Sequence, residues 1–357
     1  MVYIFFIQGE GRGHLTQALT LKEKLLARGH KIGAIVVGTK NINDLPSFFQ
    51  EAFSNIRLEI VHSPKFRKDR HNQGINIWLS LWPVIKRSPR YLQEIKKIKN
   101  LVADIKPDAL INFYEPLAGL YWRHHKERPL FCLGHQYFFT HPSFPIKSLS
   151  FFQRIALRSY NYLSAPAGAI KIGLSFTNEQ DRPAKNLYIA PPLIRTVIKK
   201  EVPQDKGFIL SYVLNHGYFS EIIHWCQNNP GRRVCCFGDK KNLGDLSLPL
   251  NLEINYLSGK KFIEALANCS ALAATAGFET IAEAAYLGKP ILMVPTKNHF
   301  EQSGNAADAK RAKLAISNIY FNLSLLDKQK TPSFSGQVAF KEWVDNYSDK
   351  IIKIIER

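Results

Sequence analysis

Short apolar runs alternate with amphipathic stretches in the first half of the chain, and turn residues separate them. Residues 2–7 predict a buried strand, and residues 15–28 predict a helix that Gly29 ends. Further strands of this half are predicted at residues 31–37, 109–113, 130–133 and 169–176. Buried strands that alternate with helices predict a parallel sheet with helices on both faces.

The same alternation restarts after residues 190–207, which are rich in proline and charge and lack a period. Strands are predicted at residues 208–214, 233–237, 271–275 and 291–294, and helices at 218–227, 262–269 and 281–287. The α/β pattern predicts two doubly wound, Rossmann-like domains that face a central cleft. We expect the domains at 1–194 and 208–337, a linker at 195–207, and a last helix, about 338–357, that packs back on the first domain.

Composition agrees with a two-domain protein of the cytoplasm. The chain has 357 residues, a hydrophobic share of 45% and no apolar run of the ~20 residues that a membrane-spanning helix needs. Its opening residues lack the basic start and small-residue cleavage site of a signal peptide. The five cysteines, Cys132, Cys226, Cys235, Cys236 and Cys269, show no CxxC spacing. They indicate buried thiols in a reducing compartment.

Charge is concentrated in the first half. The net charge is +19, and residues 1–194 hold 27 Lys/Arg against 13 Asp/Glu, which makes +14 of it. Such a field favours anionic partners, namely nucleic acid, acidic lipid headgroups or phosphorylated substrates, although a solvated basic surface also aids solubility. No nucleic-acid-binding module is recognisable, and the basic residues do not alternate with aromatic ones, so we expect no nucleic-acid partner.

The loop QGEGRGHLTQA (8–18) follows the first strand and opens a helix. Gly11 and Gly13 let the backbone approach a ligand there. The dinucleotide pattern GxGxxG is not met, because its third glycine is His14 and no acidic residue ends the second strand. A histidine at this turn suits a general base that takes a proton from an acceptor hydroxyl. The alternative is a structural histidine that caps the helix.

A second loop spans residues 274–306 and runs strand, glycine turn, helix, strand, polar loop. Thr275, Gly277 and Thr280 surround a predicted helix N-terminus, whose N–H groups can bind a diphosphate. Glu283 lies on the same helix face, where a carboxylate can accept both hydroxyls of a ribose. Glu301 and Gln302 follow the next strand, within reach of a sugar. Each residue alone is also explained as a cap, a solvated carboxylate or a loop amide.

The segment GFETIAEAAYLGKPILMVP followed by FEQSGNA resembles the donor-binding signature of GT-B glycosyltransferases. These include the lipid-linked N-acetylglucosaminyltransferase of peptidoglycan synthesis, the UDP-glycosyltransferases and a group of uncharacterised bacterial and archaeal enzymes. GEGRGHLTQALTL, PDALINFYEP and LGHQ match the last group, so the resemblance covers most of the chain.

The resemblance implies an inverting, metal-independent transfer of a sugar from a nucleoside-diphosphate sugar, usually UDP-linked, to a hydroxyl. It places Gly277, Phe278, Glu279 and Thr280 at the diphosphate, Glu283 at the ribose, Glu301 and Gln302 at the sugar, and His14 at the catalytic base. No cofactor and no metal are expected, and the chain has no convincing DxD motif.

Two positions depart from the family pattern. Relatives commonly carry an aspartate near the end of the fourth strand, where it orients the base, but here Phe113 stands at that place and Glu115 follows two residues later. Either Glu115 orients the base in place of the aspartate, or His14 acts as the base without a carboxylate partner. Plant-type enzymes place a phosphate-contacting histidine where this chain has Thr275, whose hydroxyl can still donate a hydrogen bond.

The acceptor side points to an anionic or membrane-borne partner. Residues 57–99 contain 11 Lys/Arg and three Asp/Glu, and within them residues 74–99 combine tryptophans with a basic helix; residues 144–163 form a second candidate. Such segments suit the surface of an anionic membrane. We therefore expect a lipid-linked or cell-envelope glycan acceptor and peripheral contact with the inner face of the plasma membrane. The alternative is that these aromatic residues belong to the core.

Two other function classes remain open. A nucleotide-sugar 2-epimerase on the same fold would share the diphosphate turn but would need its own acid/base carboxylates. A nucleic-acid-binding protein is suggested by charge alone. An epimerase needs no acceptor, so a product assay with donor alone separates it from a transferase.

Overall fold

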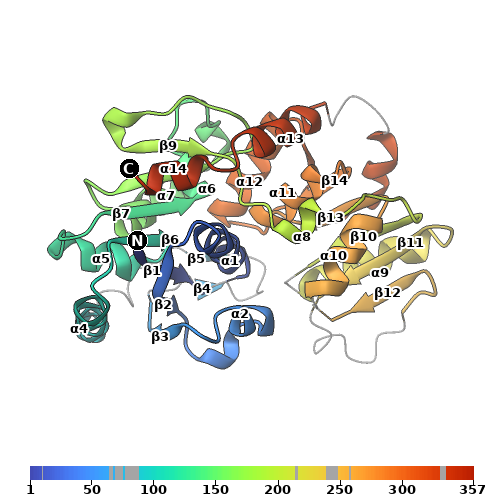
Figure 1. The fold of residues 1–357 in the computed structure, drawn as a ribbon. Coiled ribbons are helices and arrows are strands. Elements are labelled where there is room, and N and C mark those ends of the chain that lie inside the picture. The colour runs from blue at the N-terminus through green and yellow to red at the C-terminus, as the bar shows by residue number, and fades with distance from the viewer. Residues whose placement is uncertain are drawn as a thin grey trace. The chain divides into compact units, whose positions relative to one another are not determined.

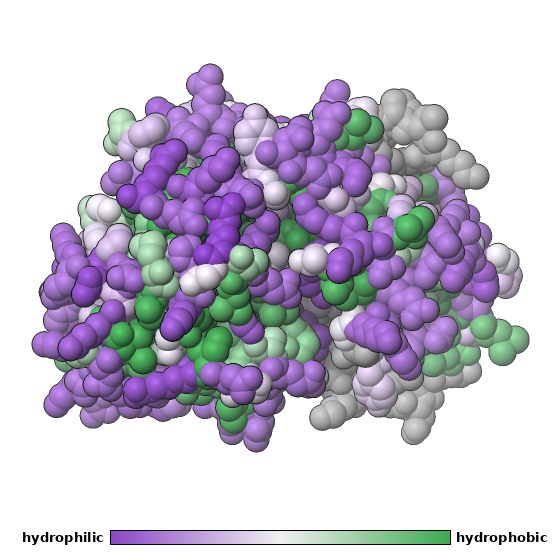
Figure 2. Space-filling view, viewed as in Figure 1, coloured by the Kyte–Doolittle hydropathy of each residue, from purple (hydrophilic) through white to green (hydrophobic). Residues whose placement is uncertain are grey.

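The computed structural model describes the chain outside residues 10, 64–66, 69–74, 77–87, 214–215, 239–247, 257–258 and 330–334. The chain forms two compact units (Figure 1). Unit 1 comprises Met1–Arg67, Asn76–Leu193 and Tyr347–Arg357, and unit 2 comprises Lys68–Ile75 and Ile194–Asn346. Hydrophilic side chains cover most of the face that Figure 2 shows. No helix among the described residues is long and apolar enough to cross a bilayer.

Unit 1 is built on seven parallel strands in the order β3-β2-β1-β6-β7-β8-β9. Their bounds are β1 Val2–Gln8, β2 Lys31–Gly38, β3 Arg57–Val61, β6 Ala109–Phe113, β7 Leu130–Gly134, β8 Ile170–Leu174 and β9 Leu187–Ala190. Every residue of β6 and β7 is buried, which explains why their sequences are continuous apolar runs rather than alternating ones.

Helices and short turns connect these strands. The helices are α1 Gly13–Leu26, α2 Ser47–Ala52, α4 Ser88–Ile105, α5 Pro116–His124, α6 His135–Phe138, α7 Phe151–Ser164 and α14 Lys350–Ile355; the 3-10 turns are η1 Ile42–Asp44, η2 Ile146–Ser148 and η3 Pro183–Lys185. α1 packs on β1 and β2, whereas α4, α5 and α7 form a row in that order. Right-handed crossovers leave β1 and β6 in opposite directions, so α1 and α5 cover opposite faces of the sheet.

Unit 2 repeats the design with six parallel strands in the order β12-β11-β10-β13-β14-β15. The strands are β10 Phe208–Tyr212, β11 Arg233–Phe237, β12 Leu252–Asn255, β13 Ala271–Thr275, β14 Ile291–Val294 and β15 Ile316–Ser317. The helices are α8 Thr196–Lys199, α9 Phe219–Asn228, α10 Gly259–Asn268, α11 Phe278–Tyr286, α12 Phe300–Arg311 and α13 Gln337–Asn346, with 3-10 turns η4 His216–Tyr218 and η6 Leu323–Gln329. Two short strands, β4 Arg67–Lys68 and β5 Ile75–Asn76, pair with each other. The prediction of an α/β fold with two doubly wound sheets is thus confirmed.

Each sheet has one point where the strand order reverses. In unit 1 it lies between β1 and β6, and in unit 2 between β10 and β13. In doubly wound sheets ligands bind outside the carboxyl ends of the strands at such a point. The loop with His14 follows β1, and the loop with Gly277 follows β13, so both candidate loops stand at these positions.

The last helix differs from the single helix predicted at 338–357. The structure has α13 and α14, separated at residues 347–349. Ser348 and Asp349 in this stretch, and Asn346 directly before it, compete with helical hydrogen bonds through their side chains, which favours a break. Arg28 pairs with Asp349 at 2.9 Å and with Glu356 at 3.2 Å, both within unit 1.

Candidate functional site

The turn between β13 and α11 presents a helix N-terminus at the edge of the unit 2 sheet. Gly277 is the N-cap residue of α11, with φ −77° and ψ 137°. The first four N–H groups of a helix have no partner within that helix, and its N-terminal end carries partial positive charge. A Cβ built on Gly277 would meet no described atom within 4 Å, so space is open in front of this turn. The arrangement suits a diphosphate.

Asn305 fixes this turn from α12, and the sequence reasoning did not assign it a role. Its side chain is fully buried, and Nδ2 donates a 2.8 Å hydrogen bond to the carbonyl of Ala276. The bond holds the residue that immediately precedes Gly277. Asn305 belongs to the FEQSGNA motif, but spacing alone does not show which residue of a motif supports the backbone and which faces a ligand.

The predicted sugar-binding residues lie at the start of α12. Glu301 and Gln302 occupy its first turn, and both are half-buried. Gln302 Oε1 accepts a 2.8 Å hydrogen bond from the N–H of Thr296, which ties the helix to the end of β14. The His299 imidazole caps the helix, and burial lowers its pKa although the charge of Glu301 opposes this. The side-chain oxygen of Gln302 therefore holds the loop between β14 and α12 in place. Its side-chain NH₂ group can still donate hydrogen bonds.

The remaining predicted donor residues divide between the end of β13 and α11. Thr275 is the last residue of β13 and is buried, whereas Thr280 in the first turn of α11 is half-buried. Phe278 and Glu279 have buried side chains. At these two positions a phosphate at the helix N-terminus would meet the backbone rather than the side chains.

Glu283 is almost completely buried and is engaged by a cation that the sequence reasoning missed. Arg195 donates from Nε to Glu283 Oε1 and from Nη2 to Oε2, both at 2.6 Å. The exposed fractions of the two side chains are 19% and 2%. Arg195 belongs to the stretch predicted as a linker, 88 residues away in sequence, so no local pattern could connect the two.

His14 lies in a buried polar cluster of unit 1. Its Nδ1 is 3.1 Å from Gln17 Oε1, and its Nε2 is 3.5 Å from Gln136 Nε2. If the neutral imidazole donates from Nδ1 to Gln17, its Nε2 lone pair faces the Gln136 amide. The His14 ring also stacks on Tyr114, with ring centroids 5.8 Å apart. The histidine thus faces the edge of the sheet where β1 and β6 end.

Glu115 takes a different position in the same unit. It is fully buried and is the N-cap residue of α5, where its Oε1 accepts from the N–H of Leu117 at 3.0 Å and also from the hydroxyl of Ser63. A Cβ on Gly38 would collide with its Oε2, so glycine at the end of β2 leaves room for this carboxylate. The hydrogen bonds of Glu115 therefore anchor the corner between β6 and α5.

Tyr114 joins His14 to the rest of the cluster. Its backbone has φ 62°, a left-handed conformation that is strained for a bulky residue and occurs often at functional sites. Its hydroxyl donates to Asn161 Oδ1 at 2.7 Å, and Asn161 Nδ2 donates to the carbonyl of Gln136 at 3.1 Å. Gln17, Tyr114, Gln136 and Asn161 were absent from the sequence-predicted site, although LGHQ contains Gln136.

The glycine-rich loop before α1 lies close to this cluster. Gly11 has φ 86°, a conformation that favours glycine, and a Cβ there would meet no described atom within 4 Å. Gly13 is the first residue of α1.

Among the described residues, no group of three His, Cys, Asp or Glu side chains gathers as metal ligands do.

Comparison with known proteins gives a consistent family. The family model described as "Glycosyl transferase family 1" matches residues 1–335. An "Uncharacterized glycosyltransferase" of Methanosarcina mazei is 25% identical over 332 residues, covering 86% of this chain and 83% of the relative. One from Methanosarcina acetivorans is 24% identical over 341 residues, with the same coverage.

Solved structures with the same fold are more distant in sequence. A "Glycotransferase of kitacinnamycin" has 14% identity and a TM-score of 0.66, covering 100% of this chain and 98% of its own. "Spinosyn Rhamnosyltransferase SpnG complexed with thymidine diphosphate" has 13% identity and a TM-score of 0.62, covering both chains fully. Phytolacca americana UGT2, complexed with UDP-2fluoro-glucose and pterostilbene, has 10% identity and a TM-score of 0.62, covering 97% and 94%. These likenesses show that the fold is GT-B.

Proposed function

Because the chain belongs to glycosyl transferase family 1 and is thus a glycosyltransferase, we propose that it transfers a sugar, with inversion, from a nucleoside-diphosphate sugar to an acceptor hydroxyl. Unit 2 holds the donor, and unit 1 binds the acceptor and supplies the base. The observation that carries this proposal is the open glycine turn at the N-terminus of α11, at the strand-order reversal of unit 2. Two structures of similar fold were solved with thymidine diphosphate or a UDP-sugar, which supports a nucleotide-linked donor.

The donor chemistry follows from the turn and its neighbours. The N–H groups at the start of α11 and the positive end of its dipole stabilise the charge that develops on the leaving diphosphate. The N–H of Gly277 itself donates to the Thr275 carbonyl at 2.7 Å and so shapes the turn. In this proposal no divalent cation is needed for that role. Glu283 accepts hydrogen bonds from the ribose hydroxyls, and Glu301 with Gln302 binds the sugar. Thr275 adds a hydroxyl donor beside the diphosphate.

His14 acts as the general base in this proposal. As the acceptor oxygen forms its bond to the anomeric carbon, the bond from that carbon to the diphosphate breaks on the opposite side, and the hydroxyl proton passes to the imidazole. Attack from the opposite side inverts the anomeric configuration. Gln17 orients the imidazole through Nδ1. Glu115 supports the site by holding the corner of β6 and α5.

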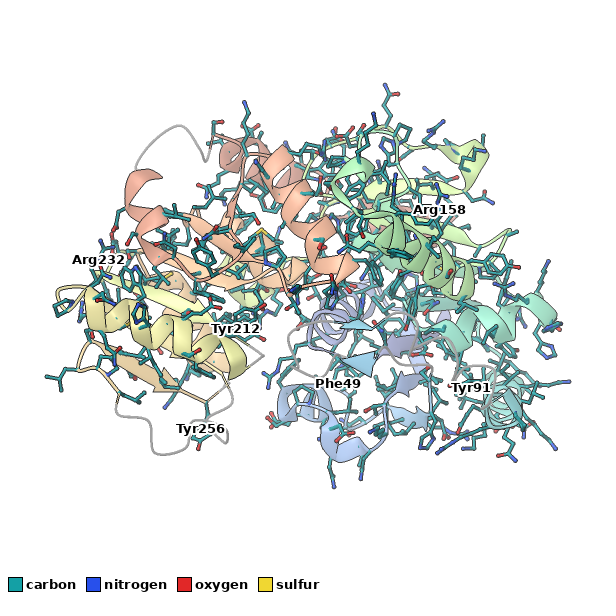
Figure 3. All side chains as sticks on the ribbon, turned by 180° about the vertical axis from the view of Figure 1, so that it is seen from behind. Phe49, Tyr91, Arg158, Tyr212, Arg232 and Tyr256 are labelled. Atoms are coloured by element: carbon teal, nitrogen blue, oxygen red, sulfur yellow. The ribbon has the colours of Figure 1, made fainter. Side chains whose placement is uncertain are left out.

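The acceptor is proposed to be anionic and borne by a membrane, and the exposed face of α7 supports this. Phe151, Ile155, Arg158 and Tyr162 follow one another at helical spacing and are all exposed, with Phe151 63% and Tyr162 62% accessible. Figure 3 labels Arg158 on this helix. The opposite face of α7 is buried, so the aromatic residues of this helix divide between the core and the exposed surface. Residue 74 and residues 77–87 of the other predicted contact, 74–99, lie outside the described residues.

Nucleotide binding and product analysis test the proposal. Isothermal titration with UDP, ADP, GDP, CDP and TDP is expected to show binding of at least one, with UDP as our first choice. Glu283→Ala should weaken that binding, whereas Asp327→Ala, on an exposed residue of unit 2, should not. If no nucleoside diphosphate binds, the donor assignment is wrong. Conversion of a nucleotide-sugar without an acceptor would instead indicate an epimerase.

A further inference from the structure

The ion pair between Arg195 and Glu283 in unit 2 is short and bidentate. Both hydrogen bonds are 2.6 Å long, and the planar guanidinium meets both carboxylate oxygens. Bidentate contacts of this kind fix the orientation of a carboxylate as well as its charge. A carboxylate offers about four lone-pair directions, so two remain after Arg195 has bound.

A second carboxylate lies one turn away on the same helix. Glu279 and Glu283 are four residues apart on α11, and both are buried. Burial by itself lowers the pKa of Arg195, but the charge and hydrogen bonds of Glu283, together with the charges of Glu279 and Tyr212, raise it above the usual value. The guanidinium therefore stays charged and offsets part of a negative cluster that would otherwise repel a diphosphate.

The position of the pair connects it to ligand binding. Tyr212, which interacts with Arg195 and is labelled in Figure 3, is the last residue of β10. Because α11 follows β13, the pair lies where the strand order of unit 2 reverses. Buried ion pairs add little net stability compared with apolar residues of similar size, because desolvation offsets their attraction. A buried pair at this edge is thus better explained by positioning than by stability.

We propose that Arg195 is a positioning residue of the donor site: it orients the Glu283 carboxylate so that the two remaining lone-pair directions face the 2′- and 3′-hydroxyls of a ribose. The inference rests on the proposed function, because it assumes a nucleoside-diphosphate ligand. It adds that the preference of this enzyme for a ribonucleotide over its 2′-deoxy counterpart depends on Arg195, although Arg195 itself need not touch the nucleotide.

Calorimetric titration of the full chain with UDP, ADP, GDP and CDP and with their 2′-deoxy forms tests this. The wild type is expected to bind one ribonucleotide at least about tenfold more tightly than its 2′-deoxy form, the size expected for one hydrogen bond to a charged group. In Arg195→Gln and in Glu283→Gln the ratio should fall toward one. Arg195→Lys keeps the positive charge but loses the bidentate geometry of the guanidinium, so it should retain part of the preference for the ribonucleotide. Arg232→Gln, which removes an exposed ion pair of unit 2, should keep the wild-type ratio.

The double variant Arg195→Gln/Glu283→Gln completes a double-mutant cycle with the two single variants. It removes both charges of the pair together, so Glu283 is not left as a buried charge without Arg195, and the variant remains informative if Arg195→Gln alone does not fold. Because both residues act through one carboxylate, the double variant should lose no more of the ratio than Glu283→Gln alone. A folded Arg195→Gln protein with the wild-type ratio would overturn the inference, as would effects that multiply in the double variant. Failure of the wild type to bind any nucleoside diphosphate would instead remove the proposed function itself.

Discussion

His14 Nδ1 lies 3.1 Å from Oε1 of Gln17, one turn further along α1. When Nδ1 carries the proton and donates it to this amide oxygen, the Nε2 lone pair faces the Gln136 amide nitrogen 3.5 Å away. Unlike a carboxylate, the Gln17 amide adds no negative charge that would stabilise the imidazolium. The base that we propose for this enzyme is thus oriented by a neutral group within its own helix.

Removal of the imidazole tests the catalytic role of His14. His14→Ala should lower kcat by about 10²–10⁴, the usual contribution of a general base, because no group then takes the acceptor proton. Nucleotide binding measured by calorimetry should stay unchanged, since the donor residues belong to unit 2. His124→Ala, on an exposed histidine of the same unit, is the control. Full activity of His14→Ala would show that it is not the base.

Gly277→Ala separates stability from donor binding. A methyl group at this position meets no described atom, and φ −77° is allowed for alanine, so the free energy of unfolding should change by less than ~1 kcal/mol. The same methyl group would occupy the space in front of the α11 N-terminus. Nucleoside-diphosphate affinity should therefore fall at least about tenfold in calorimetry. Wild-type affinity in a folded variant would place the diphosphate elsewhere.

Vesicle sedimentation tests the exposed face of α7. Wild-type protein should sediment with vesicles containing phosphatidylglycerol at low salt and less so at about 0.5 M salt, which screens the charges. Phe151→Ser/Phe152→Ser should reduce the bound fraction, because two exposed aromatic side chains no longer enter the interface. Tyr256→Ser, on an exposed aromatic residue of unit 2 (Figure 3), should not. Equal sedimentation of the α7 variant and the wild type would exclude this face.

Asp345 predicts a pH-dependent term in the stability of unit 2. Burial alone would raise its pKa, but hydrogen bonds from Lys199 and Tyr286, with the charges of Lys199 and Lys341, lower it. A lowered pKa contributes stability above the unfolded value of about 3.9, and this is lost as the pH falls through the folded value.

Asp345→Asn should therefore shift the urea midpoint downward at pH 7 and have a smaller effect at pH 3. Asp327→Asn, in the exposed pair with Arg232, serves as the control and should change little at either pH. An effect of Asp345→Asn that is independent of pH would show that its charge is not the cause.

The sheet strands were the most predictable part of the chain, because a strand buried on both faces must be apolar throughout. The predicted bounds of β13 and β14 match the structure residue for residue. α11 begins at Phe278, three residues before the predicted helix, since its N-cap is a glycine with no side-chain cap signal. The break between α13 and α14 could not be predicted from the hydrophobic pattern, because apolar residues continue on both sides of it.

The candidate site was predictable only where its residues are close in sequence. The proposed donor loop, from Thr275 to Gln302, is one contiguous segment. Arg195 is 88 residues from Glu283, and Gln136 is 122 residues from His14, so these contacts exist only once the sheets have formed. Side-chain direction also decides roles that spacing cannot, as with Glu115, whose carboxylate caps a helix.

Unit 1 consists of separate stretches of the chain, so it can complete its fold during synthesis only after its last stretch has been made. Ile351, Ile352, Ile354 and Ile355 of α14 are all buried in this unit, yet the ribosome makes them only after the whole of unit 2. The nascent first unit therefore keeps an uncovered apolar surface while residues 194–346 are translated, a period of roughly 10 s or more at bacterial elongation rates. Unit 2, whose sheet comes from one continuous stretch, can complete its core first.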